Sequence, residues 1–353
     1  MPAADTRDAT GHALLTATAS VVCLIVAYWA GLEHANLAVW TTFMVTAQYA
    51  FTAFQKGLER IVGRGLGILA GLVLATWLNE TSLLTIALIG VLLTAFFYVY
   101  FAGRLAYTFL NAGLYLVAMF HIGHSDPTAA VPQAEGLFAA IVLGVVVADV
   151  VTWLAGVESD LAIRFGEQPL WPIRGEWLSQ SLMLAVTVLL TLMGARAIGL
   201  PPSQAAVSVM LLTVTPHIQA LVRKGELRVV GLFLAAVWSL ITFLLVGLLP
   251  YLPLLAALLF LGQFVATYLA RAAGKFSYAG LQMGLVLPMV VVAPPTDFGS
   301  FTPARQRLEG VLLGLLASVL VAGLWFGFPV ADEVAPEPPP PPPPPVFPGE
   351  MDV

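Results

Sequence analysis

One acidic residue lies well inside a strongly apolar run of this sequence. Asp149 is enclosed by the valines and alanine of 145–151. A carboxylate in hydrocarbon is expensive and usually belongs to a transport pathway, a cation partner or a proton relay. Asp149 is therefore a candidate for proton coupling. It also lies near the end of its apolar run, so snorkelling to water or pairing with a loop arginine is the alternative interpretation.

Two cationic pairs have the spacing of one helical turn. Lys56 and Arg60 belong to the motif Lys-Gly-x-x-Arg-x-x-Gly, and the same motif returns with Lys224 and Arg228. Residues four apart project from one face of a helix. Such pairs would either concentrate organic anions at a cytoplasmic mouth or simply anchor the chain in the membrane. The recurrence of the motif leaves both interpretations open.

A phenol and an amide also recur at four-residue spacing. Tyr107 precedes Asn111, and Tyr278 precedes Gln282. Buried polar side chains of this kind either join helices by hydrogen bonds, worth on average about 0.6 kcal/mol each, or contact an aromatic carboxylate in transit. With the two cationic pairs, these four residues make up the candidate substrate path.

Patterns typical of enzymes are absent from the sequence. It has no phosphate-binding G-x-x-x-x-G-K-S/T loop, no C-x-x-C and no H-E-x-x-H, and its one cysteine, Cys23, lies in an apolar run. His121 and His124 are a close pair without a third ligand, which is weak evidence for a metal. We therefore expect no catalytic residues, no metal and no cofactor.

The sequence is an internal duplication. From Lys56 to Lys224 the shift is 168 residues, and in that register nine of the 33 positions of Gly31–Gly63 are identical. A shift of 171 pairs Gly103 with Gly274 and the two tyrosine–amide pairs with one another. The candidate site residues thus recur in two copies of one unit, apart from Asp149, whose counterpart is Val319.

Composition indicates which elements position these residues. The 353 residues are 59% hydrophobic and 10% charged, with a mean hydropathy of +0.91. Such a chain belongs in a bilayer. Apolar runs long enough to cross roughly 30 Å of hydrocarbon predict an all-α polytopic protein with twelve spans, at 13–30, 36–54, 61–78, 83–101, 104–121, 136–156, 181–198, 204–222, 229–248, 252–270, 276–293 and 308–327.

Six spans per copy is an even number, so the two repeats must be parallel and related by an axis along the membrane normal. With the N-terminus inside, 12 of the 15 Lys and Arg face the cytoplasm, and only Arg196, Arg305 and Arg307 face outward. The positive-inside rule then places both termini in the cytoplasm. The expected organisation is a cytoplasmic N-terminus (1–12), a first repeat (13–156), a cytoplasmic linker (157–180), a second repeat (181–327) and a disordered Pro-rich tail (328–353).

Small residues follow one face of the third span. Gly63, Gly67 and Gly71 lie four apart, and Gly231 with Ala235 repeats the pattern in the second copy. Small side chains let helix backbones approach closely in a membrane. We interpret this stripe as packing.

Several of these motifs together resemble a known superfamily. Ala38-Val39-Trp40 opens the second span, Lys56-Gly-x-x-Arg60-x-x-Gly63 enters the third, and Pro295-x-Asp297 precedes a last span with Gly310-x-x-x-Gly314. Over residues 12–328 the chain resembles the fusaric acid resistance and aromatic acid exporter superfamily. It departs from larger relatives in its short linker and in Arg64, where a small hydroxyl residue is common.

The resemblance implies a multi-pass permease of the bacterial inner (cytoplasmic) membrane that exports aromatic or other small organic acids. It further implies proton coupling and a periplasmic adaptor of the membrane-fusion type. The alternatives are a passive organic-anion channel and a non-transporting scaffold that recruits a partner through its Pro-rich tail. We expect membrane lipid and small organic anions as partners, self-association as an option, and no nucleic acid.

Overall fold

The computed structural model describes residues 6–47, 53–78, 83–103, 105–157, 173–200, 206, 209, 218–292 and 302–326. Within these ranges the regular structure is helical, with eleven α-helices and one 3-10 helix, η2, at Gly274–Phe276. In the first half the helices are α1 (Thr6–Trp29), α2 (Ala35–Thr46), α3 (Ala53–Trp77), α4 (Leu83–Phe101), α5 (Ala106–Ser125) and α6 (Ala130–Leu154). In the second half they are α7 (Gly175–Ala197), α9 (Ile218–Leu248), α10 (Leu252–Ala272), α11 (Ser277–Val291) and α12 (Thr302–Phe326).

Eight of these helices are long and apolar enough to cross a membrane. Two others are short, since α2 has 12 residues and α11 has 15, while α3 carries Arg60 and Arg64 inside its length. In the part of the chain that is described, the expected twelve spans are therefore not all present as full-length apolar helices. The expected span 204–222 falls largely outside that part, as do most of the linker, Pro295–Asp297 and the Pro-rich tail.

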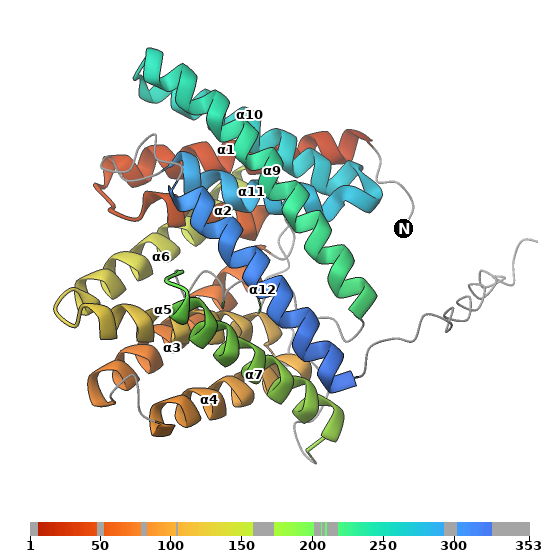
Figure 1. Ribbon diagram of the computed structural model, residues 1–353. Coiled ribbons are helices and arrows are strands. Elements are labelled where there is room, and N and C mark those ends of the chain that lie inside the picture. Colours follow the sequence, from red (N-terminus) through yellow and green to blue (C-terminus); the bar gives the residue numbers. More distant parts are fainter. Residues whose placement is uncertain are drawn as a thin grey trace, which may run out of the picture.

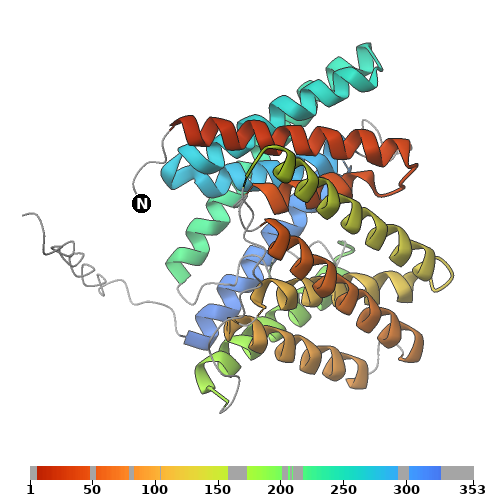
Figure 2. The ribbon, with the colours of Figure 1, turned by 180° about the vertical axis from the view of Figure 1, so that it is seen from behind.

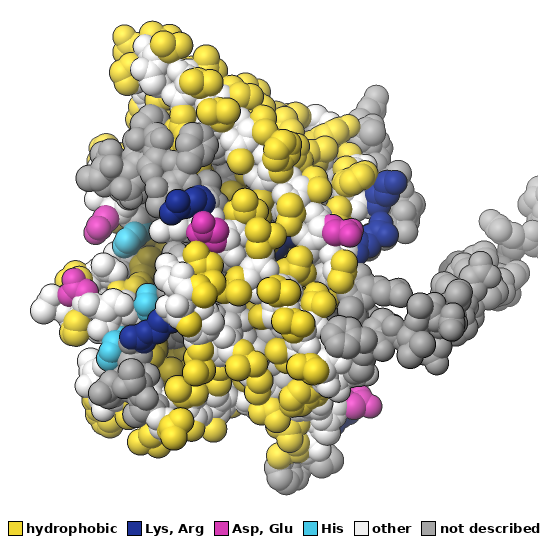
Figure 3. Space-filling model, viewed as in Figure 1, with side chains coloured by type: hydrophobic (Ala, Val, Ile, Leu, Met, Phe, Trp, Pro, Cys, Tyr) yellow, Lys and Arg dark blue, Asp and Glu magenta, His cyan; other side chains and the backbone are white. Residues whose placement is uncertain are grey.

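The surface is consistent with a bilayer around these helices. Figure 3 shows hydrophobic side chains across the middle of one face, with charged and histidine side chains mainly toward its two edges. Trp29, Trp77 and Trp153 at helix ends are strongly exposed, as the aromatic belts at membrane interfaces require.

Helix contacts follow the same scheme in both halves. In the first half α3 packs against α5 and α6, α4 packs against α5, and α1 packs against α6. In the second half α9 packs against α11 and α12, α10 packs against α11, and α7 packs against α12. The halves meet where α1 packs against α10, where α4 packs against α7 and where α2 packs against α11. The first two contacts are counterparts of each other and lie at opposite ends of the molecule (Figures 1 and 2).

Burial repeats as well. Along α1 and α7, positions that are 168 residues apart are buried together, and exposed positions such as Leu14 and Leu182 also match. The buried pairs are Ala13 with Ser181, Thr16 with Leu184, Ala17 with Ala185, Ala19 with Thr187, Ser20 with Val188, Cys23 with Thr191, and Ala27 with Ala195. The duplication seen in sequence is therefore accompanied by equivalent packing.

The recurring glycines have a backbone reason. Gly31 and Gly199 have φ values of 64° and 72°, which favour glycine. Each ends its helix with the same pair of bonds: Gly31 N–H reaches the Tyr28 carbonyl and Leu32 N–H reaches the Ala27 carbonyl, at 3.1 and 3.0 Å. This is a Schellman cap, and in the first half it turns the chain from α1 toward α2.

The predicted stripe of small residues is a site of close helix approach. A Cβ on Gly63 would strike the backbone carbonyl of Thr108, and one on Gly67 would strike that of Ala112. In the second half, Gly231 lies equally close to the carbonyl of Ala279. These contacts hold α3 against α5 and α9 against α11, which fixes the depth at which the arginines of α3 and α9 lie.

Candidate functional site

Two arginines on α3 are enclosed by protein. Arg60 and Arg64 are 1% and 0% exposed and lie one turn apart, so they share a helix face. The close α3–α5 approach directs this face toward α5 and α2. Charged side chains buried in a membrane protein are rare and usually functional.

Arg60 is held by an aromatic pair. Its Nη1 donates a hydrogen bond to the phenolic oxygen of Tyr107. Its guanidinium lies 4.5 Å from the ring centroid of Trp40 and 5.6 Å from that of Tyr107. Cation–π contacts of this kind contribute about 2 kcal/mol where water is excluded.

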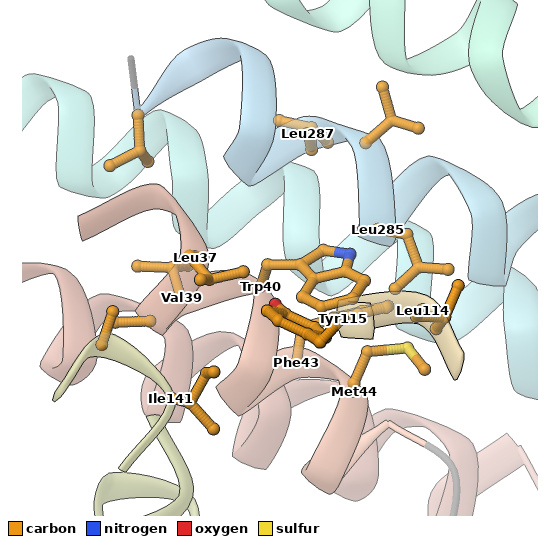
Figure 4. Close-up of a cluster of buried hydrophobic side chains, with 14 of the residues drawn as sticks. Leu37, Val39, Trp40, Phe43, Met44, Leu114, Tyr115, Ile141, Leu285 and Leu287 are labelled. Atoms are coloured by element: carbon orange, nitrogen blue, oxygen red, sulfur yellow. The ribbon is translucent and has the colours of Figure 1, made fainter. Parts of the chain in front are cut away.

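Arg64 has a different set of partners. Its Nε donates to Asn111 Oδ1 at 3.2 Å and its Nη1 donates to Thr41 Oγ1 at 3.1 Å. The guanidinium also lies 4.8 Å from the Trp40 ring centroid and 4.7 Å from that of Tyr115. Trp40 therefore contacts both cations, and Figure 4 shows Trp40 and Tyr115 together among the buried side chains of this region. We call Trp40, Thr41, Arg60, Arg64, Tyr107, Asn111 and Tyr115 the arginine–aromatic site.

Three buried N–H donors of this site have no acceptor among the described residues. They are Arg60 Nε, Arg64 Nη2 and Trp40 Nε1. In the described ranges no carboxylate forms an ion pair with either arginine. A buried charge without a counterion costs several kcal/mol, and each unsatisfied buried donor adds about 1–3 kcal/mol. An anion that accepts hydrogen bonds has the charge and the acceptors to satisfy these groups.

The second half preserves only part of this arrangement. Arg228 on α9 is 1% exposed and lies close enough to Tyr278 for the two to interact electrostatically. Gln282 is buried, and its Cβ packs directly against Gly231. The counterparts of Arg64, Trp40 and Tyr115 are Leu232, Ser208 and Val286. Two adjacent buried guanidiniums thus occur in the first half at these equivalent positions and not in the second.

The structure corrects one expectation about the cationic pairs. Arg60 and Arg228 are buried among helices and do not form rims at a mouth, because α3 and α9 begin before the arginines and carry them inward. Lys56 and Lys224 are only partly buried and lie nearer the helix starts. Each lysine is therefore separated in depth from the arginine of its own pair.

Asp149 lies apart from the arginine–aromatic site. It is half-buried on α6 and faces α3, where a Cβ on Gly57 would lie 3.6 Å from Asp149 Oδ2. Its Oδ1 is buried and accepts no hydrogen bond from the described residues. The geometry brings Tyr107 to Arg60 and Asn111 to Arg64, but it brings Asp149 to neither arginine.

Sequence reasoning missed four members of the site. Arg64 was counted among the cytoplasmic cations and noted as a departure from larger relatives, whereas Trp40, Thr41 and Tyr115 were given no role in a site. A signal was present, since Arg64 follows Arg60 by one turn inside an otherwise apolar segment. Trp40 entered the sequence analysis only as part of the Ala38-Val39-Trp40 motif.

Fold and site together define a polytopic, all-α membrane protein with a buried cationic, aromatic-lined site. Residues 22–151 match the model of the family described as fusaric acid resistance protein-like. The match confirms the resemblance over residues 22–151, a range that includes the whole arginine–aromatic site. No curated protein and no solved structure matches the chain significantly.

Proposed function

We propose that this protein is a permease for small organic anions, with aromatic carboxylates as the preferred class, and that the arginine–aromatic site binds the carboxylate. The observation that carries the proposal is the set of three unsatisfied donors, Arg60 Nε, Arg64 Nη2 and Trp40 Nε1, beside two cations without a counterion. The family match supports a role in transport.

The chemistry of the site suits a flat acid. Guanidinium groups bind carboxylates through paired, charge-assisted hydrogen bonds. Trp40 and Tyr115 flank Arg64, and aromatic faces favour offset stacking with a planar ring. Both arginines are enclosed, so a ligand enters only when helices or rings move. Alternating exposure to the two sides of the membrane is the motion that a permease requires.

The remaining features complete the proposed mechanism. The corresponding contacts of the halves support twelve spans in two parallel repeats.

The distribution of cations supports the orientation. With Arg60, Arg64 and Arg228 removed from the count because they are buried, nine Lys and Arg remain on the expected cytoplasmic side against three outside, which favours cytoplasmic termini in a bacterial inner membrane. Asp149, with its unpaired oxygen, is the proposed proton carrier. A periplasmic adaptor and self-association of the chain remain part of the proposal.

Efflux from energised cells tests this function. Cells expressing the protein are loaded with radiolabelled benzoate or hydroxybenzoates, and release is followed with and without an uncoupler. The proposal predicts efflux that is sensitive to the uncoupler and lost in Arg60→Leu. Efflux that persists with the uncoupler and only runs down the substrate gradient would instead establish a passive channel. Release no faster than from control cells, with and without a co-expressed adaptor, would contradict transport altogether.

A further inference from the structure

A separate apolar groove lies where α4 of the first half meets α7 of the second. Its volume is about 640 Å³, and residues of both helices line it. Figure 1 shows these two helices together at one extreme of the molecule, far from α1 and α10. The lining includes Ile86, Gly90 and Thr94 from α4, and Leu182, Ala185 and Leu189 from α7.

Small side chains make this groove, and apart from Thr94 and Tyr98 its lining residues are apolar. At Gly90 a Cβ would lie 3.2 Å from Leu189 Cδ1, so α7 approaches α4 closely here while Ala87 and Ala95 leave space beside the contact. Two α4 hydroxyls line the groove: that of Thr94 donates to the Gly90 carbonyl of its own helix at 2.7 Å, and that of Tyr98 lies at one end. The occupant must therefore be apolar along its length.

One end of the groove has a cationic, aromatic border. Tyr98 lines the groove, its phenolic oxygen accepts the backbone N–H of Arg174 at 3.1 Å, and its ring meets that of Trp177 edge-on at 5.9 Å. The exposed Arg174 guanidinium lies 4.4 Å from the Trp177 ring centroid. Arg174 precedes α7 with an extended backbone, and Glu176 lies in the first turn of that helix.

The dimensions match a lipid chain. From Ile86 to Tyr98 the helix rises about 18 Å at 1.5 Å per residue, and one leaflet contributes about 15 Å of the roughly 30 Å hydrocarbon core. Tyrosine and tryptophan lie at head-group level in membrane proteins, and basic pockets between helices bind anionic head groups. We propose that this groove binds one acyl chain of an anionic glycerophospholipid, with the lipid phosphate held by Arg174 beside Tyr98 and Trp177.

The cationic, aromatic border occurs at the α4–α7 contact and not at its counterpart at the other end of the molecule. The α1–α10 contact is the counterpart of the α4–α7 contact, and at a shift of 168 residues Thr6 and Ala9 replace Arg174 and Trp177. Packing between helices alone would not require a cation and an indole at one of these two contacts. A bound head group gives both residues a partner, whereas a second copy of the chain would cover the groove without needing the exposed cation.

Native mass spectrometry of the full chain, purified in mild detergent and supplied with phosphatidylglycerol or phosphatidylcholine, tests the inference. We expect a retained phosphatidylglycerol adduct on the monomer, weakened roughly fivefold in Arg174→Gln because one interfacial cation is lost. Ala95→Phe, which fills the groove, should remove the adduct of either lipid. Arg305→Gln, which changes an exposed arginine paired with Glu309 at 3.5 Å, is the matched control and should bind as the parent does.

Three results would overturn the proposal. One is equal binding of the two lipids by the parent protein. Another is an unchanged phosphatidylglycerol adduct in both Arg174→Gln and Ala95→Phe. The third is a dimer that Ala95→Phe dissociates, which would assign the groove to a second copy. None of these outcomes depends on transport, so the lipid site and the proposed function are tested independently.

Discussion

Arg60 donates a hydrogen bond to Tyr107 across the α3–α5 contact, although 47 residues separate them in the chain. The second half places Arg228 close enough to Tyr278 for the two to interact electrostatically. An arginine facing a tyrosine is thus a feature of the duplicated unit. Only the first half adds Arg64 and Trp40 to it, and we therefore assign anion binding to that half.

Replacing Arg64 with leucine, the residue at the equivalent position of the second half, separates binding from stability. We expect Arg64→Leu to lower benzoate efflux at least tenfold, because one charge-assisted carboxylate contact contributes about 1.5–3 kcal/mol. Unfolding should not become easier, since an apolar side chain in place of an uncompensated buried charge is often neutral or stabilising. Efflux and the unfolding temperature are measured on the same preparations.

A control for this variant is Arg305→Leu, which makes the same change at an exposed position. It should leave efflux unchanged. If Arg64→Leu exports benzoate as well as the parent protein does, the second guanidinium has no part in binding.

Removing the Tyr107 hydroxyl should weaken substrate binding without abolishing it. Tyr107→Phe keeps the ring near Arg60 but leaves Nη1 without its acceptor. The Arg60 donor is then free to bind substrate, but the position of the guanidinium is no longer fixed. Losing this hydrogen bond costs about 1–3 kcal/mol, so we expect KM to rise by about 5-fold to 150-fold. Tyr28→Phe, at a distant phenol on α1, is the control. An unchanged KM in Tyr107→Phe would show that the hydrogen bond does not position Arg60.

The α3–α5 contact makes a prediction about stability. A Cβ at Gly67 would meet the Ala112 carbonyl, Leu116 N at 2.9 Å and Tyr115 Cβ at 2.9 Å. Backbone atoms cannot move aside cheaply, so Gly67→Ala should destabilise the protein by about 1–3 kcal/mol and displace Tyr115 from Arg64. Gly194→Ala, where nothing lies within 4 Å, should instead be neutral or stabilise by up to about 1 kcal/mol. Equal thermal stability of the two variants would contradict the close approach.

The turn between α1 and α2 predicts a dependence on pH. Burial lowers the pKa of His34 below its ordinary value of 6.5, and the nearby Glu33 opposes this only in part. Unfolding releases the imidazole to a higher pKa, so the unfolded chain binds the extra proton and stability declines as the pH falls below 6.5.

His34→Gln should remove this contribution. The thermal stability of parent and variant is compared between pH 7.5 and pH 5, and the parent should lose more. Parallel pH profiles would show that burial of His34 is not linked to proton uptake.

The proposed role of Asp149 in proton coupling can be tested by mutation. Asp149→Asn keeps the size of the side chain and removes its ability to release a proton, so efflux should continue down the substrate gradient but lose its sensitivity to an uncoupler. Asp8→Asn changes an exposed carboxylate of α1 and should retain that sensitivity. Uncoupler-sensitive efflux in Asp149→Asn would assign coupling to another group.

Much of the architecture could be predicted from local patterns. Hydrophobic runs locate most helices because bilayer thickness dictates their length, and Gly31 and Gly199 recur because each takes a positive φ at a helix end. The small-residue stripe of α3 predicted close packing, which Gly63 and Gly67 make with α5. The lengths of α2 and α11 were not predicted. The apolar runs there are long enough to span a bilayer, but the α-helices within them have only 12 and 15 residues.

The site was harder to predict, because its members come from three helices. The pairing of Tyr107 and Asn111 with arginines depends on how α3 and α5 are rotated, and sequence spacing within one helix does not determine that rotation. Arg64 was counted with the cytoplasmic cations because a charged residue near the start of a predicted span usually faces that side, whereas α3 begins at Ala53, about three turns before it. Trp40 joined the site only through tertiary packing, where its ring lies against both guanidiniums.

Equilibrium binding of radiolabelled benzoate to the purified full chain tests the central claim most directly. The parent protein should bind about one benzoate, displaced by other aromatic carboxylates but not by benzamide, because the unsatisfied donors need a charged acceptor. Arg64→Leu, folded to the same thermal stability or better, should bind none at the same concentrations. Saturable binding that survives in Arg64→Leu, or equal competition by benzamide, would contradict the assignment of the arginine–aromatic site as the anion-binding centre.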